Sequence, residues 1–446
     1  MINGGRFLLF LLLSGLLMWA LVDWGARLGG ASGAVAAAWA AALCPIIVSN
    51  FSIVATDATS AVFFFLTFWL LSFQERSKKK MAAAGACVGL ALASKFNMIV
   101  LPVMAGAMLF LDAYLGRRED KKAPAFPFEA AGAAVACALA ALALSYGMFQ
   151  FDMYFKGLIA TLKRLDQGRS AFFHGAHSVT GFLLYFPAAL ALKTPIPVLS
   201  FSAERIWRWA RGGRREHLWV LLPMLGYFAV AMTSKVQIGV RHILPMMPFF
   251  ALCAGCGAAA LYDAGGWRRK LALAGAVWAL VSVGKTSPYQ LAYFNEAAGG
   301  PDGGYRWLVD SNLDWGQDLK SLAQETAARG NPPIYLSYFG SADPDYYGIK
   351  YLPLAMCCNV TRRGSGVDPA ASGRVLLAVS ATNLQAVYFR HKNLFSWLKE
   401  RRPAAKPGYS IFLYDLTDDR DGRSKLADLV KATTGDPSLV KSLLLQ

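Results

Sequence analysis

Long apolar runs separated by short polar segments recur along the chain from Phe7 to Val283, and then they stop. The hydrocarbon core of a bilayer is about 30 Å thick, so a helix needs about 20 apolar residues to cross it. The runs therefore predict a bundle of about ten transmembrane helices over residues 1–285. We place the spans near 7–22, 33–48, 59–73, 81–93, 98–115, 128–149, 180–201, 218–232, 243–261 and 271–283.

After residue 287 the pattern changes, and the chain becomes richer in Gly, Pro, Asp and Tyr. Strands that alternate with helices are typical of a small α/β domain. The predicted fold class is therefore mainly α, a polytopic transmembrane helix bundle, with a C-terminal α/β domain over residues 286–446. Short runs typical of strands lie at 334–338, 375–379 and 409–414, and helical stretches lie at 317–329 and 394–401.

The protein carries a net charge of +17, yet only 16% of its residues are charged and 55% are hydrophobic. The basic residues cluster in every second loop between the apolar runs, which argues against nucleic-acid binding. This is the positive-inside pattern, and it places these loops in the cytoplasm. The loops contain Arg76, Lys78, Lys79 and Lys80; Arg117, Arg118, Lys121 and Lys122; Arg205, Arg208, Arg211, Arg214 and Arg215; and Arg268, Arg269 and Lys270.

The same alternation fixes the sidedness of the other segments. Counting back from the first basic loop puts Arg27 inside and Met1 outside, although no signal peptide precedes the first span. We therefore expect the natural N-terminus to include one further helix that this chain lacks. The segments expected on the outer side are 50–56, 95–97, 151–178, 233–242 and everything after residue 285.

Residues 152–170 form an unusual outer segment. Apolar side chains at Phe155 and Leu158 are spaced to share one helical face, and Lys156 and Lys163 fall on another. This spacing predicts an amphipathic helix that either lies in the outer membrane interface or caps the bundle.

Ionisable residues at or inside a membrane are costly and are functional hypotheses by default. Asp57 enters an aromatic-rich helix at its outer start, where it is either an N-cap or part of a site or metal contact. Lys95 lies in a tight outer turn, where it either extends to the headgroups or holds a lipid phosphate.

Three further cationic residues, Lys235, Arg241 and His242, precede the span at 243–261 on the same outer side. Arg is the better bidentate partner for phosphate. Clustered cations there fit an anionic headgroup, and anchoring of the helix in the interface is the alternative.

Lys193 lies midway along the span at 180–201, where an unpaired ammonium costs at least about 2.5–3.5 kcal/mol. The sequence Thr194-Pro195-Ile196-Pro197 follows it. The prolines break the helix and expose carbonyl groups that can accept from the ammonium, in a structural or a catalytic role.

In the C-terminal part, residues 310–318 combine acids and amides with a tryptophan. Asp310, Asn312 and Asp314 are the candidates there for hydrogen bonds to sugar hydroxyl groups. A turn followed by a capped helix start at Asp314 explains the same residues without a ligand.

Several of these motifs resemble a known family. Thr56-Asp57 at the start of an aromatic helix, Ser94-Lys95 after a Gly/Ala/Leu span, and Arg241-His242-Ile243-Leu244-Pro245 resemble the bacterial family 39 glycosyltransferases. That family belongs to the GT-C superfamily, alongside protein O-mannosyltransferases and the aminoarabinose transferase of lipid A. The resemblance covers nearly the whole chain and is most distinctive at 310–318.

The resemblance implies an enzyme of the bacterial cytoplasmic membrane that moves a sugar from a polyprenyl-phosphate carrier to a lipid, glycan or protein acceptor on the outer face. It implies that Asp57 matches the family's second acidic position and that Lys95 and Arg241 bind the carrier phosphate. A divalent metal, Mg²⁺ or Mn²⁺, is left open as a cofactor. The family begins with a helix and a large outer loop that bears the catalytic aspartate, and we expect this chain to lack both. We therefore expect it to bind carrier and to have little or no transferase activity.

A polytopic transporter is the main alternative, because a broken helix with an intramembrane lysine suits one. A non-catalytic partner of a glycan-assembly system is a third interpretation. If the enzyme interpretation holds, Asp57, Lys95, Lys235 and Arg241 should converge on one outer-facing cavity.

Overall fold

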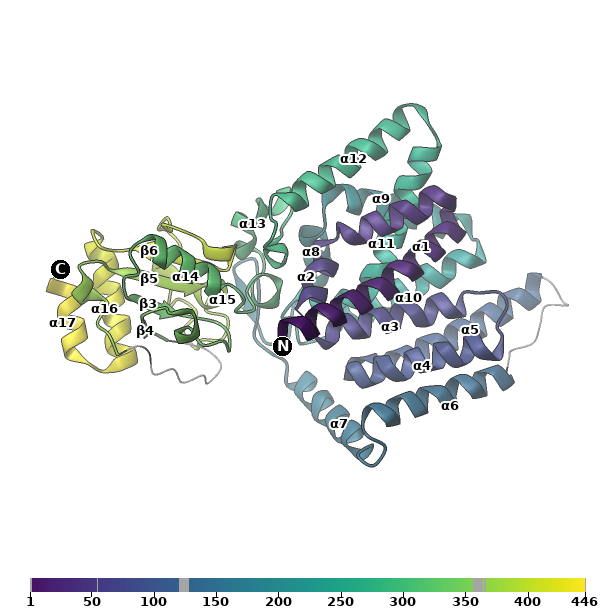
Figure 1. Ribbon diagram of the computed structural model, residues 1–446, viewed down its shortest axis with the longest axis horizontal. Coiled ribbons are helices and arrows are strands. Elements are labelled where there is room, and N and C mark those ends of the chain that lie inside the picture. Colours follow the sequence, from purple (N-terminus) through teal and green to yellow (C-terminus); the bar gives the residue numbers. More distant parts are fainter. Residues whose placement is uncertain (1, 54, 120–127, 356–363, 365, 446) are drawn as a thin grey trace. The chain divides into compact units, whose positions relative to one another are not determined.

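The computed structural model describes residues 2–53, 55–119, 128–355, 364 and 366–445 (Figure 1). Lys121 and Lys122 of the predicted basic loops lie outside the described residues. The chain forms two compact units. Unit 1 contains Met1–Gly168 and Leu183–Gln290, and unit 2 contains Arg169–Phe182 and Leu291–Gln446.

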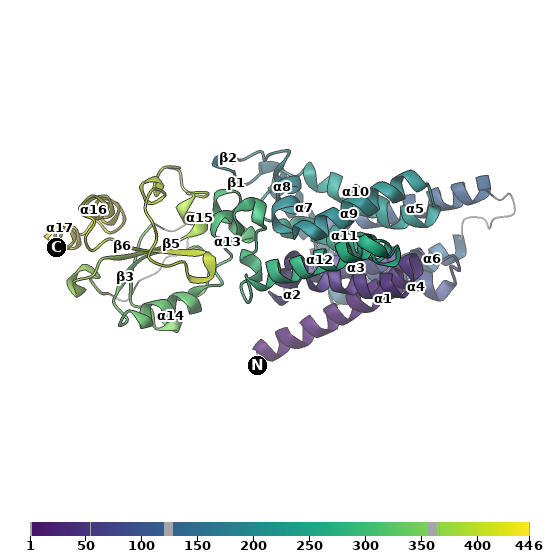
Figure 2. The same cartoon turned by 90° about the horizontal axis from the view of Figure 1, so that it is seen from above.

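Unit 1 is a helix bundle in which each predicted apolar run overlaps helical structure (Figure 1, Figure 2). α11 is almost wholly buried, as expected for a helix that is apolar on all sides. The helices are α1 (Ile2–Ala42), α2 (Pro45–Ser52), α3 (Thr56–Leu71), α4 (Lys78–Ser94), η1 (Phe96–Ile99), α5 (Val100–Glu119), α6 (Phe128–Ser145), α7 (Asp152–Gln167), α8 (Tyr185–Lys193), α9 (Ile196–Gly212), α10 (Arg215–Met232), η2 (Val240–Met246), α11 (Met247–Asp263) and α12 (Gly266–Gly284).

The helices of unit 1 make the chain a multi-pass membrane protein. Within the described residues, four helical segments are long and apolar enough to cross a membrane, and α8 with α9 makes a fifth candidate that is bent by 119°. The count of about ten spans stays a prediction. The four segments are Gly4–Ala42, Phe96–Arg118, Phe128–Ser145 and Val240–Asp263.

The first predicted span and most of the second lie within α1. Its helical backbone is interrupted at Gly29 and Gly30. Gly30 has a φ of +66°, in the left-handed region that glycine adopts without steric cost. The interruption falls in the predicted short loop between the two spans.

α4 and α6 pack closely because α4 presents two glycines four residues apart. A Cβ atom at Gly85 would lie 2.0 Å from the carbonyl oxygen of Ala134, and one at Gly89 would lie 2.2 Å from that of Ala138. Small residues at this spacing let two helix backbones approach each other in a membrane. The short predicted span at 81–93 is thus part of a longer helix held by backbone contact.

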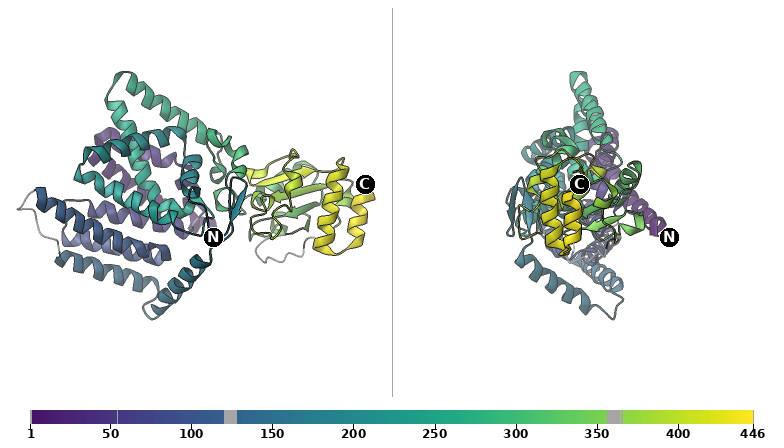
Figure 3. Two further views of the ribbon diagram at one scale, coloured as in Figure 1. Left: turned by 180° about the vertical axis from the view of Figure 1, so that it is seen from behind. Right: turned by 90° about the vertical axis from the view of Figure 1, so that its left-hand side faces the viewer.

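Unit 2 contains a four-stranded sheet, so the predicted α/β character of the C-terminal part is confirmed (Figure 3). The strand order is β4-β3-β5-β6, with β3 parallel to β4 and β5, and with β6 antiparallel to β5. Buried side chains of α14 pack with those of the sheet in one core. The strands are β3 (Ile334–Ser337), β4 (Tyr351–Pro353), β5 (Leu376–Ser380) and β6 (Ile411–Asp415), and the longer helices are α14 (Leu319–Ala328), α16 (Arg420–Thr434) and α17 (Pro437–Leu445).

Two details of unit 2 differ from the sequence analysis. The helix expected at 394–401 is only the short turn η9 (Ser396–Leu398). A two-stranded hairpin, β1 (Ala171–Phe173) and β2 (Ala176–Ser178), also belongs to unit 2, although its residues precede α8. The remaining short helices are α13 (Gly300–Gly303) and α15 (Ala381–Leu384).

Candidate functional site

Asp57 lies in the first turn of α3, and its side chain is only 5% exposed. The helix cap itself is Ala55, so Asp57 is not the N-cap of α3. A carboxylate in the first turn still interacts favourably with the helix dipole. Burial of this charge requires partners, and the structure supplies two cations.

The two cations come from distant segments of the chain. Lys95 ends α4 and starts η1 with an extended backbone, and its Nζ donates to Oδ1 of Asp57. Arg241 lies in η2, and its Nη1 is 3.8 Å from Oδ2 of Asp57. Asp57, Lys95 and Arg241, the ion cluster, thus carry one negative and two positive charges. Three of the four side chains predicted to converge on one cavity lie together, but none of the three is among the residues that line the cavity described below.

Tyr227 of α10 lies beside the cluster and was not singled out in the sequence. Its hydroxyl accepts from Nδ2 of Asn97 at 2.9 Å and donates to the carbonyl oxygen of His242 at 3.2 Å. These two bonds tie the segment after Lys95 to the segment after Arg241. Tyr227 lies in an apolar run, where its sequence does not distinguish it from a core aromatic residue.

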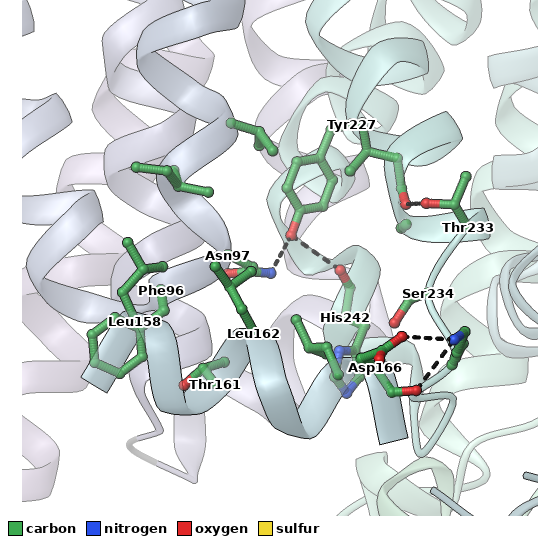
Figure 4. Close-up of a pocket in the computed structure, with 16 residues that line it drawn as sticks. Phe96, Asn97, Leu158, Thr161, Leu162, Asp166, Tyr227, Thr233, Ser234 and His242 are labelled. Atoms are coloured by element: carbon green, nitrogen blue, oxygen red, sulfur yellow. Dashed lines mark hydrogen bonds and ion pairs between the residues drawn. The ribbon is translucent and has the colours of Figure 1, made fainter. Parts of the chain in front are cut away.

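A cavity of about 420 Å³ adjoins these hydrogen bonds (Figure 4). Its walls come from α7, η1, the start of α5, α10 and η2. His242, which follows Arg241 in η2, is one of the residues that line this cavity. The lining is mostly apolar, with Asn97, Thr161, Tyr227 and Ser234 among its polar members.

Lys235 does not join the ion cluster, so the prediction that all four side chains lie together is wrong for this residue. Its Nζ lies 2.9 Å from Oδ1 of Asp166, at the C-terminal end of α7, and 3.2 Å from the carbonyl oxygen of the same residue. Lys235 also lines the cavity. Lys235 lies in the segment between α10 and η2 and pairs with α7, whereas Arg241 lies in η2 and faces Asp57 of α3.

Lys193 is the last residue of α8, directly before the 119° bend into α9, and it is 2% exposed. The predicted helix break at the following prolines is therefore present. Its position at this break fits a structural role as well as a functional one, as the sequence analysis left open.

In the acidic stretch of unit 2, Asp310, Asn312 and Asp314 are buried whereas Gln317 is exposed, and the role in sugar binding stays a prediction. Asp310 accepts from the Tyr388 hydroxyl, and Asn312 donates to the carbonyl oxygen of Val309 at 2.9 Å. Both side chains are used inside the unit. Binding a sugar with them requires opening these contacts, whereas the alternative of a structural turn does not.

Asp314 is also buried, and it shares this stretch with Asp318. Its carboxylate accepts from the backbone N–H groups of Thr382 at 3.0 Å and Gly316 at 3.3 Å. Burial raises the pKa of Asp314 to about 8 and that of Asp318 to about 6, and the hydrogen bonds from Thr382 and from Ser410 only partly oppose this. The two carboxyl groups thus hold residues 382 and 410 to this stretch inside unit 2.

Within the part of the chain that the structure describes, no group of three or more His, Cys, Asp or Glu side chains is placed to hold a metal ion. Two cations facing one carboxylate beside an apolar cavity suit a different ligand. The arrangement can bind an amphiphilic phosphate, since guanidinium and ammonium groups are the usual partners of phosphate in proteins.

Comparison with known proteins gives one family match. The model of the dolichyl-phosphate-mannose-protein mannosyltransferase family matches residues 5–146, which is less than half of the chain and includes Asp57 and Lys95. No curated protein matches.

Two solved structures have a similar fold. The crystal structure of ArnT from Cupriavidus metallidurans bound to undecaprenyl phosphate shares 14% identity at a TM-score of 0.46, covering 92% of this chain and 83% of that chain. The apo form of the same protein shares 13% identity at a TM-score of 0.45, with the same coverage. This similarity is too low to support an argument about the present chain.

Proposed function

We propose that the protein is a membrane glycosyltransferase of the GT-C superfamily. It takes a sugar from a polyprenyl-phosphate carrier and passes it to a lipid, glycan or protein acceptor at the outer face of the cytoplasmic membrane. The observation that carries the proposal is the convergence of Asp57, Lys95 and Arg241 from three separate segments. The family match over residues 5–146 supports it, because two of these residues lie within the matched region.

The charges of the ion cluster fit such a reaction. Lys95 and Arg241 bind the carrier phosphate and stabilise the charge that develops on it as the bond between sugar and phosphate breaks. An acceptor oxygen attacks the anomeric carbon, and Asp57 accepts the proton that this oxygen loses. The electrons of the broken bond remain on the phosphate, which leaves with the carrier lipid. This proposal departs from the expectation of little or no transferase activity, and the transfer rate of the wild type decides between the two.

The proposal is tested by sugar transfer from a labelled polyprenyl-phosphate donor to extracted membrane acceptors. We expect Arg241→Ala to lower the rate about 100-fold, because removing one donor to the developing charge typically costs that much. Lys78→Ala is the matched control, since Lys78 forms an exposed ion pair with Glu129 at 2.9 Å on the same bundle. Equal rates for the Arg241 variant and the control would contradict the proposal.

A transporter is the second candidate, and the 119° bend with buried Lys193 at its start favours it. Sealed proteoliposomes separate the two functions. A transporter moves an intact solute across the bilayer, whereas the proposed enzyme leaves a new covalent sugar product on one side. Solute uptake without any new glycosidic product would favour the transporter.

A further inference from the structure

The cavity of unit 1 has a polar end of its own at Asp166 (Figure 4), which is the partner of Lys235. Among its described lining residues, none belongs to the ion cluster. We propose that this cavity holds one hydrocarbon chain of an anionic membrane phospholipid, whose phosphate replaces Asp166 as the partner of Lys235. This inference concerns a second lipid site, and it does not rest on the proposed transferase function.

The walls of the cavity suit a single hydrocarbon chain. The volume of about 420 Å³ lies toward the lower end of the range of about 300–1,000 Å³ for sites that enclose one small ligand. Burying an apolar chain here is favourable in proportion to the area removed from water. The apolar lining side chains are Phe96, Ile99, Val100, Leu158, Leu162, Leu165, Val230 and Ala231.

The ion pair at the mouth of the cavity is exposed and therefore easily exchanged. The side chains of Lys235 and Asp166 are 47% and 85% exposed. Such surface pairs contribute only about 0–1 kcal/mol. A phosphate diester supplies the same negative charge to Lys235, so replacing the carboxylate costs little.

The position of α7 explains why a membrane lipid is the occupant. One side of α7 lines the cavity through Leu158 and Leu165, while Met153, Phe155 and Ile159 expose their apolar side chains. A helix with an exposed apolar face and several cations is typical of the membrane interface, where anionic phospholipids are concentrated. The chain of such a lipid then enters beside α7, with its phosphate at the level of Lys235.

α7 also has a fixed wall to rest on, so the cavity is a built feature. A Cβ atom at Gly157 would lie 2.4 Å from the ring of Phe96, and only glycine permits this approach. The rings of Phe96 and Tyr154 lie 5.6 Å apart between centroids. The contact between α7 and η1 therefore closes one side of the cavity and leaves the side at Lys235 as the entrance.

The test is lipid retention, measured by native mass spectrometry after the full-length protein is incubated with phosphatidylglycerol or with phosphatidylcholine of the same acyl chains. We expect the wild type to retain one phosphatidylglycerol in preference to phosphatidylcholine. Lys235→Ala should lose this preference, and Leu158→Trp, at a partly buried lining residue, should lower retention by filling the cavity. Equal retention of the two lipids by the wild type, or an unchanged preference in Lys235→Ala, would overturn the inference.

The most decisive variant in this test is one that gains lipid binding, because a misfolded protein cannot produce such a gain. Asp166→Asn releases Lys235 from its competitor and should raise phosphatidylglycerol retention about two- to fivefold, the equivalent of a weak surface ion pair. Asp152→Asn is the matched control, since Asp152 forms an exposed pair with Lys156 at 2.7 Å on the same helix. Equal retention in both variants, or displacement of the phospholipid by equimolar polyprenyl phosphate, would refute a phospholipid site.

Discussion

Two carboxylates of unit 1 each face two cations, yet the two clusters differ in how tightly they are bound. Asp57 at the start of α3 pairs with Lys95 and, at 3.8 Å, with Arg241. Asp112 of α5 pairs with Arg76, which follows the other end of α3, and with Arg215. Since α3 has 16 residues, the clusters lie about 24 Å apart along it.

The carboxylate of Asp112 accepts three hydrogen bonds. Nε of Arg215 donates to Oδ1 of Asp112 at 2.6 Å, Arg76 donates to Oδ2, and Nε1 of Trp219 also donates to Oδ1 at 3.3 Å. The guanidinium of Arg76 lies 5.3 Å from the ring centroid of Trp219. All these groups bind one another, so the cluster joins α5, α10 and the loop after α3.

The cluster at Asp57 is looser. Its contact with Arg241 is longer than a hydrogen bond, and its neighbours Phe96 and His242 line a cavity. An anionic ligand can replace the long contact at little cost. An equal count of charges thus gives a clamp where both cations hydrogen-bond to the carboxylate and, as we propose, a ligand site where only one of them does.

The largest expected effect is on stability at Asp112. Asp112→Ala leaves Arg76 and Arg215 without their carboxylate, which we expect to cost about 3 kcal/mol, at the low end for a buried pair. In detergent, the Tm followed by tryptophan fluorescence should fall by several degrees. Asp263→Ala, at an exposed carboxylate at the end of α11, should change Tm little. Equal Tm values for both variants would show that the cluster is no clamp.

The complementary expectation concerns activity at Asp57. Asp57→Asn keeps the size of the side chain and one oxygen that can accept from Lys95. We expect sugar transfer to fall at least about 100-fold, because the amide cannot accept a proton. The Tm should fall less than in Asp112→Ala. A variant that transfers at the wild-type rate, or that loses as much Tm as the Asp112 variant, would break the distinction between site and clamp.

The same two clusters show what could be predicted from the sequence. Asp57, Lys95 and Arg241 could be grouped because each lies at the end of an apolar run on the same predicted side. Asp112 lies within an apolar run, and Arg76 counted only as a loop cation. Its clamp depends on how α5 and α10 pack, which hydrophobic periodicity does not reveal.

Unit 2 shows the opposite failure. Its acidic stretch is polar in sequence, where sugar binding and a capped turn were both open, and the structure buries Asp310, Asp314 and Asp318. The partners of Asp314 and Asp318 include Thr382 and Ser410, which are far away in the sequence. The α/β class was predictable from alternating local patterns, whereas the burial of these acids follows from long-range contacts.

Asp314 is a third buried carboxylate, and unlike Asp57 and Asp112 it has no cation as a partner in the ion pairs of the described residues. Because its folded-state pKa is raised from 3.8 to about 8, the folded protein holds an extra proton between these values. The stability from neutral Asp314 is therefore complete below pH 3.8 and is lost as the pH rises through about 8.

We expect hydrogen exchange of β5 to show this loss. Between pH 5 and pH 8, the protection of its amides, corrected for intrinsic exchange, should fall about tenfold for each pH unit. Asp314→Asn should flatten the profile and leave only the part below pH 6 that comes from Asp318. A wild-type profile parallel to that of the variant would show that Asp314 is ionised in the folded protein.

The smallest expected effects come from substitutions that keep the charge of each cluster and change only the geometry of its hydrogen-bond donors. Arg215→Lys keeps the charge but removes the Nε donor that lies 2.6 Å from Asp112, and we expect a loss of about 1 kcal/mol in stability. Lys95→Arg keeps the charge at the looser cluster, and Tm should change less because that cluster adjoins a cavity. Its effect should appear in the KM for the polyprenyl-phosphate donor. If both conservative variants lower Tm equally and leave KM unchanged, the two clusters are the same kind of structural ion pair.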